Sequence, residues 1–252
     1  SMVQVACFDT AFHRTLSEVA RRYALPDEEA RAGLQRYGFH GLSYEFVVGE
    51  LGAKTLGRAV IAHLGSGASM AAVRDGQSVD TTMGFSPAGG LVMGTRLGDV
   101  DPGLLVHWLE QGHGRDAKAV DDLVNKRSGL LGISGTTSDV RDLLSRRDRD
   151  PRAALALDVF TWNARKWVGA MTASLGGLDT LVFTGGIGEH SGPMRLEIAR
   201  GLEHLGVRID PDRNARAEDV ISADGAPCTV RVVKTDEERM VARHTGKVAA
   251  AS

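Results

Sequence analysis

The sequence predicts an α/β fold, and three observations carry that prediction. Short apolar runs of strand length alternate along the chain with segments whose apolar residues recur every three or four positions, as on a buried helix face. The dipeptide Asp75-Gly76 separates two of the strand-like runs and is typical of a tight hairpin turn. Glycine contributes 31 of the 252 residues, against about 7% in an average protein. These glycines cluster after apolar runs, which favours loops shaped around a ligand.

The first part of the chain is expected to form one strand and two helices. The strand-like run lies in VQVACFDTAF, and Asp9 follows it, where an acidic residue is either an active-site group or a turn former. Helical patterns follow over residues 15–23 and 27–35, with Pro26 at the start of the second.

A helix and a set of three strands are predicted next. The segment GLSYEFVVGEL indicates a helix over residues 41–51, with Ser43 as its cap. Strands are expected over residues 59–64, 69–73 and 78–83. The glycine-rich segment HLGSGAS therefore joins a strand to a strand, which excludes the P-loop and Rossmann arrangements, since both join a strand to a helix.

The second half of the chain predicts a long buried helix followed by two further strand–helix pairs. TLVFTGG (180–186) predicts a strand, and SGPMRLEIARGLEHLG (191–206) a helix with Ser191 as a candidate cap. CTVRVVKT (228–235) predicts the last strand, and residues 236–249 a terminal helix with acidic residues in its first turn. The stripe of the long helix consists of Leu157, Phe160, Ala164, Trp167, Met171 and Leu175.

Composition excludes several classes of partner. Hydrophobic residues make up 42% and charged residues 25% of the chain, with a formal net charge of −2, which gives no electrostatic footprint for nucleic acid or an anionic membrane. No apolar stretch reaches the ~20 residues that span a bilayer, and no secretory signal opens the sequence. Only Cys7 and Cys228 are present, so no disulfide framework is indicated. We expect a cytoplasmic protein.

Taken singly, the candidate site segments leave two interpretations open. HLGSGAS (63–69) is either a phosphate-binding loop or a plain turn, and LVFTGGIGEH (181–190) is either a ligand loop or a tight strand-to-helix turn. GISGTTSDVRDLL (132–144) places Asp139 and Arg141 in the first turn of a helix, where simple capping is the alternative. No H-E-x-x-H or G-x-S-x-G motif supports a zinc or serine hydrolase.

Taken together and in order, these segments resemble the acetate kinase family. The resemblance rests on FDTAFH, RYGFHGLS, AHLGSGAS, DTTMGFSPAGGLVMGTRLGDVDPG, GISGTTSDVRDL, FTGGIGEHSGPMR and TDEERMVA. This family is the acyl-phosphate kinase branch of the actin and hexokinase superfamily. It implies a ribonuclease H-like, actin-like ATPase domain with a mixed β-sheet flanked by helices. Residues 1–235 resemble the second, nucleotide-binding domain, and residues 236–252 the terminal helix that packs on a first domain. That amino-terminal half is expected to be missing here.

The resemblance also implies roles for individual residues. Asp9, His40 and Arg96 match the family's catalytic positions, and Glu237 matches a glutamate associated with magnesium. The positions that match nucleotide contacts are His63, Leu64, Gly65, Ser66, Gly67, Asp139, Val140, Arg141, Gly186, Ile187, Gly188, Glu189 and His190.

The implied reaction is the reversible transfer of the γ-phosphoryl group of ATP to acetate, giving acetyl phosphate and ADP, with Mg²⁺, or Mn²⁺ as an alternative. A carboxylic acid is already ionised at neutral pH, so no general base is required, and Asp9 is expected to position magnesium or to orient a neighbouring group. Positive charge from Arg96, His40 and His63 suits the phosphoryl group in transfer. The family also implies a homodimer.

Two departures and two alternatives accompany the resemblance. Ser66 stands where the family usually has asparagine, and His190 stands where asparagine ends the GGIGEN motif. The acyl group could instead be propionate or butyrate, because the family's acyl pocket draws partly on the half that is expected to be missing. The other alternative is a nucleotide-binding fragment that is catalytically incomplete without that half.

Overall fold

The computed structural model describes residues 4–110 and 116–251. Its centre is a five-stranded mixed sheet in the order β3-β2-β1-β4-β5. β1 pairs antiparallel with β2, and β2 antiparallel with β3, whereas β1–β4 and β4–β5 are parallel pairs. The strands are β1 (Arg58–Leu64), β2 (Ala68–Arg74), β3 (Gln77–Thr81), β4 (Thr180–Thr184) and β5 (Thr229–Val232).

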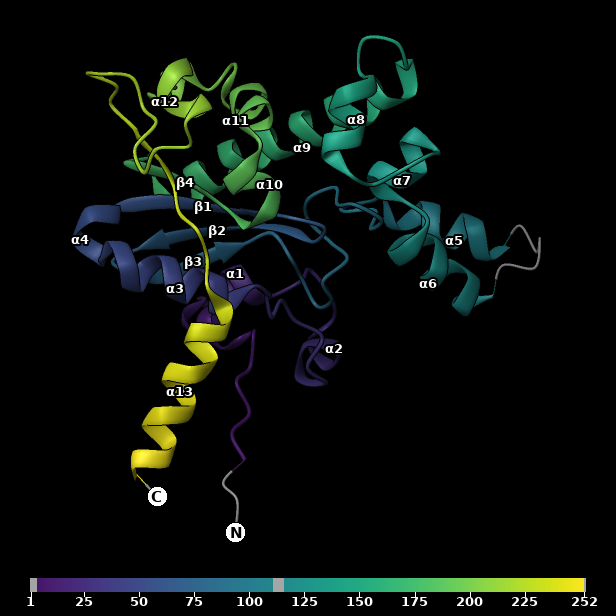
Figure 1. Ribbon diagram of the computed structural model, residues 1–252. Coiled ribbons are helices and arrows are strands. Elements are labelled where there is room, and N and C mark those ends of the chain that lie inside the picture. Colours follow the sequence, from purple (N-terminus) through teal and green to yellow (C-terminus); the bar gives the residue numbers. More distant parts are fainter. Residues whose placement is uncertain (1–3, 111–115, 252) are drawn as a thin grey trace.

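Helices cover both faces of this sheet (Figure 1). In chain order they are η1 (Ala11–Thr15), α1 (Glu18–Arg21), α2 (Asp27–Arg31), α3 (Gly41–Leu51), α4 (Ala53–Leu56), α5 (Pro102–Glu110), α6 (Ala117–Lys126), α7 (Gly129–Ser134), α8 (Val140–Arg146), α9 (Pro151–Leu175), α10 (Gly185–His190), α11 (Gly192–Ala199), η2 (Glu203–Leu205), α12 (Pro211–Ala215) and α13 (Glu237–Ala251).

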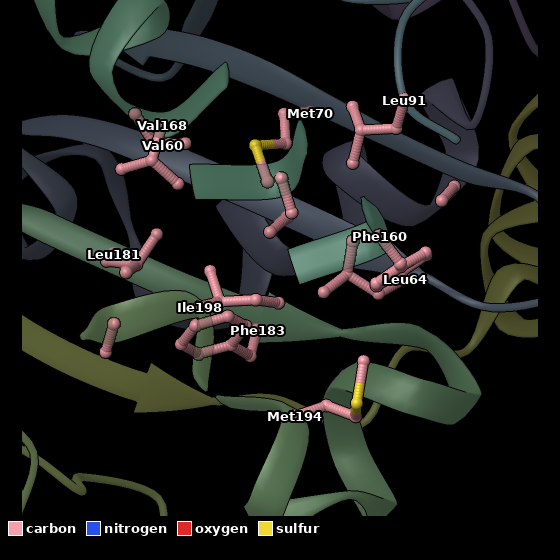
Figure 2. Close-up of a cluster of buried hydrophobic side chains, with 14 of the residues drawn as sticks. Val60, Leu64, Met70, Leu91, Phe160, Val168, Leu181, Phe183, Met194 and Ile198 are labelled. Carbon is pink, nitrogen blue, oxygen red and sulfur yellow. The ribbon is translucent and has the colours of Figure 1, made fainter. Parts of the chain in front are cut away.

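Two cores lie on opposite faces because side chains alternate along each strand. The larger core, part of which Figure 2 shows, takes Val60 and Leu64 from β1 and packs them against Phe160 of α9 and Ile198 of α11. The smaller core takes the intervening residues, such as Ile61, and packs them against α3 and α4. The sheet is therefore buried on both sides, which fixes the register of its strands.

The predicted hairpin and the long helix are confirmed. Asp75 and Gly76 both have positive φ, at 53° and 75°, which is the backbone that a two-residue hairpin turn between β2 and β3 requires. α9 extends over 25 residues and begins at Pro151, with the side chain of Asp150 accepting hydrogen bonds from the first turn. The strands predicted over 180–186 and 228–235 are also present, in shortened form, as β4 and β5.

Three predictions near the amino terminus were wrong. Residues 4–8 form no strand, because no described segment pairs with them, and Phe8 is 71% exposed. The helix predicted over 15–23 is only α1, since Ser17 is extended and caps it. The helix predicted over 27–35 ends at Arg31 because Gly33 has a φ of 89°.

The prediction that Ser43 caps the third helix was also wrong. α3 begins at Gly41, so Ser43 lies inside the helix with its side chain fully buried, and His40 occupies the cap position. The predicted boundary between residues 235 and 236 coincides with the loop before α13, which packs on α3 through Arg239 and Arg243 against Glu50. The division into two units at this point stays a prediction.

Replacement of Phe160 by alanine is expected to lower the free energy of unfolding by about 3–5 kcal/mol, because the ring is 1% exposed in the larger core. Trp162 is the matched control, since it lies one half-turn away on α9 and is 63% exposed. Trp162→Ala should change the stability by less than about 0.5 kcal/mol. Urea unfolding followed by far-ultraviolet circular dichroism measures both, and equal losses would contradict this description of the core.

Candidate functional site

The glycine loop between β1 and β2 lies beside the turn that follows β4. The parallel pairing of β1 with β4 sets His63 opposite Thr184, so the loop at residues 65–67 meets the start of α10. Gly185 has a φ of 76°, and a Cβ there would lie 2.8 Å from the carbonyl oxygen of Leu64. Only glycine permits this close approach of two backbones.

A cavity of about 770 Å³ opens at this junction. Its walls come from the glycine loop, from the segment leading into α8, and from α10 with the residues after it. The lining residues are Gly65, Ser66, Thr137, Ser138, Asp139, Val140, Arg141, Leu144, Gly186, Ile187, His190, Ser191 and Pro193. The volume suits a nucleotide-sized ligand.

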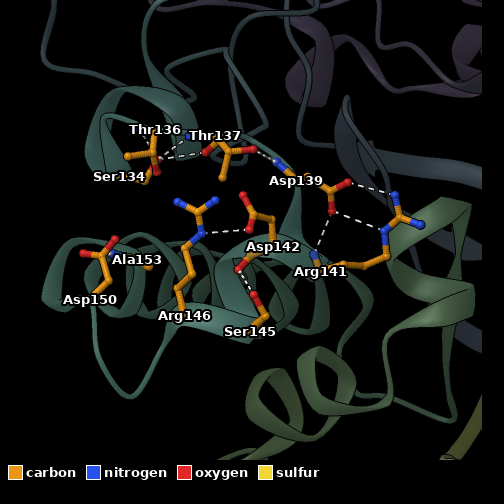
Figure 3. A network of polar contacts seen from close by, with 10 residues as sticks. All are labelled: Ser134, Thr136, Thr137, Asp139, Arg141, Asp142, Ser145, Arg146, Asp150 and Ala153. Atoms are coloured by element: carbon orange, nitrogen blue, oxygen red, sulfur yellow. Dashed lines mark hydrogen bonds and ion pairs between the residues drawn. The ribbon is translucent and has the colours of Figure 1, made fainter.

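Asp139 and Arg141 line one polar edge of the cavity, and Figure 3 shows the hydrogen bonds between them. Asp139 caps α8, since its Oδ1 accepts from the backbone N–H of Arg141 at 2.8 Å, and its Oδ2 accepts from the Arg141 guanidinium at 2.8 Å. These hydrogen bonds from Arg141 lower the pKa of Asp139 to about 2. Capping is thus present, and it leaves the Arg141 side chain 88% exposed beside the cavity.

Two histidines and an arginine meet at the other end of the glycine loop. The rings of His40 and His63 stack with their centroids 4.2 Å apart. A Cβ on Gly67 would lie 3.2 Å from both His40 Nε2 and Arg96 Nη1, so these two nitrogens face the same point of the loop. The absence of a side chain at Gly67 leaves that point open to a ligand.

Both histidines are neutral at physiological pH. Burial, together with the nearby Arg96 guanidinium and His13, lowers the pKa of His40 to about 4. Burial, with the neighbouring His40, lowers the pKa of His63 to about 3. A neutral imidazole offers an N–H donor and a lone pair but carries no charge. The fixed positive charge at this point of the loop therefore comes from Arg96 rather than from the histidines.

A serine hydroxyl lies within hydrogen-bond distance of Nδ1 in each ring. His40 Nδ1 lies 2.8 Å from Ser69 Oγ, which is in turn hydrogen-bonded to the hydroxyl of Tyr44. His63 Nδ1 lies 2.8 Å from Ser43 Oγ, which accepts a hydrogen bond from Thr235 at 2.9 Å. Sequence reasoning missed these positions, because the partners lie on separate elements and no local pattern signals them.

Asp9 anchors the start of α3. Its Oδ2 accepts from the backbone N–H of His40 at 2.6 Å, its Oδ1 accepts from Leu42 N–H at 3.3 Å, and its carbonyl accepts from Gly41 N–H at 2.9 Å. The carboxylate thus stabilises the helix N-terminus and holds His40 at a φ of 56°. Asp9 therefore fixes the backbone of His40, and its catalytic role stays a prediction.

Two glutamates lie at the edge of the site. Glu189 Oε1 accepts from the backbone N–H groups of Gly185 and Thr235, at 2.9 and 3.0 Å, and so joins the turn after β4 to the loop before α13. Burial, with the nearby Asp9 carboxylate, raises the pKa of Glu237. Within the described residues, no group of three or more metal-ligating side chains comes together.

The structure brings most of the expected site residues to these two neighbouring places. Asp9, His40, His63, Gly67 and Arg96 gather at the loop, whereas Ser66, Asp139, Arg141, Gly186 and His190 line the cavity. Leu64 and Gly188 are exceptions, since the Leu64 side chain is fully buried in the larger core and Gly188 packs against Phe183.

A family model, sequence relatives and a solved structure all match this chain to acetate or propionate kinases. Residues 1–243 match the model of the acetokinase family. The chain is 46% identical to an acetate kinase of Rhodopseudomonas palustris, and the alignment covers 99% of this chain and 64% of that relative. It is also 46% identical to a propionate kinase of Citrobacter rodentium, with 98% of this chain and 63% of that relative covered. The crystal structure of an acetate kinase from Porphyromonas gingivalis superposes with a TM-score of 0.90 at 42% identity, covering 96% of this chain and 63% of that one.

These comparisons confirm the predicted fold, an actin-like ATPase domain with a mixed sheet flanked by helices. The chain spans about 64% of the length of the relatives that it matches. Among the described residues, no helix combines the length and the apolar character needed to cross a bilayer.

We expect the protein to lose stability as the pH falls from about 6.5 towards 4. Because burial lowers the pKa of His63 to about 3, the unfolded chain takes up a proton there that the folded chain does not. Each such group makes the free energy of unfolding fall by about 1.4 kcal/mol per pH unit below the unfolded pKa of ~6.5. Urea unfolding at several pH values should show that His63→Gln removes a slope of this size. Phe160→Ala removes no titrating group and should keep the wild-type slope, so parallel curves for His63→Gln and wild type would refute the assignment.

Proposed function

Because this chain belongs to the acetokinase family, we propose that it acts as an acetate kinase, which transfers the γ-phosphoryl group of ATP reversibly to acetate and gives acetyl phosphate and ADP. The observation that carries the proposal is the junction at the glycine loop. There a nucleotide-sized cavity on one side adjoins the cluster of Arg96, His40 and His63 on the other. The activity of the whole protein is proposed from a chain that spans about 64% of its relatives.

The nucleotide would lie in the cavity with its phosphates at the loop. Gly186 presents bare backbone there, since a Cβ on it would have no neighbour within 4 Å. The exposed Arg141 guanidinium is suited to contact a phosphate or a ribose, and His190 also lines the cavity. Backbone N–H groups of a glycine-rich loop bind phosphate oxygens without side chains in the way.

Catalysis in this proposal is positioning and electrostatic stabilisation. Acetate is already ionised at neutral pH, so no residue has to remove a proton. The obstacle is the approach of two anions, and Arg96 would offset it, because its guanidinium faces Gly67, where the transferred group would pass. The two neutral histidines would add N–H donors at the same point. Asp9 would act through His40, which it holds in place.

Glu237 suits the predicted magnesium ion. Mg²⁺ usually binds proteins through one or two carboxylates plus phosphate oxygens of the substrate, so a single half-buried carboxylate fits such a site. When bound, the ion would neutralise charge on the nucleotide phosphates. The hydrogen-bonded network of Thr235 and Glu189 would keep the start of α13 next to the turn after β4.

The acyl group is proposed to be acetate, with propionate as the second candidate. The propionate kinase of Citrobacter rodentium is as similar to this chain, at 46% identity, as the acetate kinase of Rhodopseudomonas palustris. Comparing kcat/KM for acetate, propionate and butyrate decides among the three acids.

We also propose a cytoplasmic homodimer. Leu155 and Trp162 of α9 are 54% and 63% exposed, and exposed apolar side chains on one helix support association with a second copy. Light scattering that finds only the 26.8 kDa species would argue against the dimer.

ADP with Mg²⁺ is expected to bind the chain saturably in calorimetric titration, and Gly186→Trp should abolish this binding by filling the cavity. The matched control is Gly246→Trp, because Gly246 lies in α13, is exposed and has no neighbour within 4 Å of an added Cβ. Equal binding by both variants would contradict the nucleotide site.

Replacement of Arg96 by glutamine is expected to lower kcat for acetyl phosphate formation by about 10²–10³-fold. Removing one hydrogen-bond donor to a developing anion lowers kcat by a similar factor in other enzymes. ADP binding should change little, because Arg96 does not line the cavity. If the 252-residue chain binds ADP but neither makes nor consumes acetyl phosphate, it is a nucleotide-binding fragment, and the catalytic proposal fails for this chain.

A further inference from the structure

The geometry points to a specific role for four hydroxyl groups: the pairs Tyr44–Ser69 and Thr235–Ser43 hold His40 and His63 as neutral Nε2–H tautomers whose N–H donors face the glycine loop. Ser69 and Ser43 are then positioning residues. The use of the two donors on a phosphoryl group rests on the proposed function, whereas the tautomers themselves do not.

The direction of the first hydrogen-bond chain follows from burial. Tyr44 is fully buried, and Ser69 Oγ is the partner of its hydroxyl. Ser69 is also fully buried, and the partners of its hydroxyl are Tyr44 and His40 Nδ1. Every hydrogen finds an acceptor in one arrangement, in which Tyr44 donates to Ser69 and Ser69 donates to Nδ1. The reverse direction leaves the hydrogen of the Tyr44 hydroxyl buried without an acceptor, which costs about 1–3 kcal/mol.

The second chain has the same direction. Thr235 donates to Ser43 Oγ at 2.9 Å, and Ser43 is fully buried. The other partner of the Ser43 hydroxyl is His63 Nδ1, at 2.8 Å, so the hydroxyl hydrogen goes there. Because each Nδ1 accepts a hydrogen bond, the single proton of each neutral ring resides on Nε2.

Both Nε2 atoms face the glycine loop. His40 Nε2 lies 3.2 Å from the point where a Cβ on Gly67 would be, and His63 Nε2 lies 4.0 Å from the equivalent point at Gly65. The two stacked rings would therefore direct parallel N–H donors at one anion. A donor held in place before the reaction costs no reorganisation during it, which explains why neutral histidines suit this position.

His13 provides an internal comparison. Its Nδ1 also lies 2.8 Å from a serine hydroxyl, that of Ser78, but its Nε2 lies 3.0 Å from the carbonyl oxygen of Phe39. The same tautomer is therefore used within the fold, where its donor is already occupied. His13 therefore serves as a control: a serine fixes the tautomer of its ring, but its N–H donor does not face the glycine loop.

Long-range ¹H–¹⁵N correlation spectra of the 252-residue chain at pH 7, without nucleotide, test the inference. His40 and His63 are each expected to show a protonated Nε2 and an unprotonated, hydrogen-bonded Nδ1. Assignment by His40→Gln and His63→Gln identifies the signals. A protonated Nδ1 on either ring overturns the inference, whether or not the chain proves to be a kinase.

Serine replacements extend the test to the positioning residues. Ser69→Ala should shift the Nδ1 signal of His40 downfield, as expected for a nitrogen that loses its hydrogen-bond donor. The Nδ1 signal of His63 should not move. Ser43→Ala should do the reverse, and Ser78→Ala should move only the signal of His13. An unmoved Nδ1 signal in a folded Ser69→Ala or Ser43→Ala chain overturns the role of that serine. If a variant does not fold, the wild-type tautomers decide the inference.

Discussion

The parallel pairing of β1 with β4 is the constraint on which the rest of the site depends. It sets His63 opposite Thr184, and both strands turn into glycine-rich segments immediately afterwards. A shift of one residue would turn Leu64 and Phe183 out of the larger core, so the hydrophobic packing of the sheet enforces the alignment. The glycine loop and the start of α10 are adjacent because the core cannot accept another register.

The remaining parts of the site are tied to this junction by hydrogen bonds between distant segments. Asp9 holds the start of α3, and α3 carries His40 and Ser43 to the end of β1. Glu189 links the turn after β4 to Thr235, and Thr235 reaches back to Ser43. A closed set of contacts therefore connects the amino-terminal segment, α3, both central strands and the loop before α13. The segments around the glycine loop are therefore held in place by hydrogen bonds to one another.

The sequence predicted the elements whose signals are local. The apolar runs of β1 and β2, the Asp75-Gly76 turn and the stripe of α9 are each signalled by neighbouring residues, and each element is present. The missing strand over residues 4–8 shows the limit, because strand formation depends on a partner that the run itself does not specify. The expected catalytic and nucleotide positions came from resemblance to a family, and the structure brings most of them together. The hydroxyls behind the histidines could not be predicted, since Ser43 and Thr235 are 192 positions apart and a buried serine in a helix carries no sequence signal.

The central claim is that the glycine loop, the start of α8 and the start of α10 enclose one nucleotide. Photoaffinity labelling with ADP that carries an azide on the adenine ring, followed by peptide mapping, tests the claim most directly. The account predicts labelling within residues 137–144 or 186–193, suppressed by excess unmodified ADP. Labelling elsewhere, or labelling that ADP does not suppress, would contradict it.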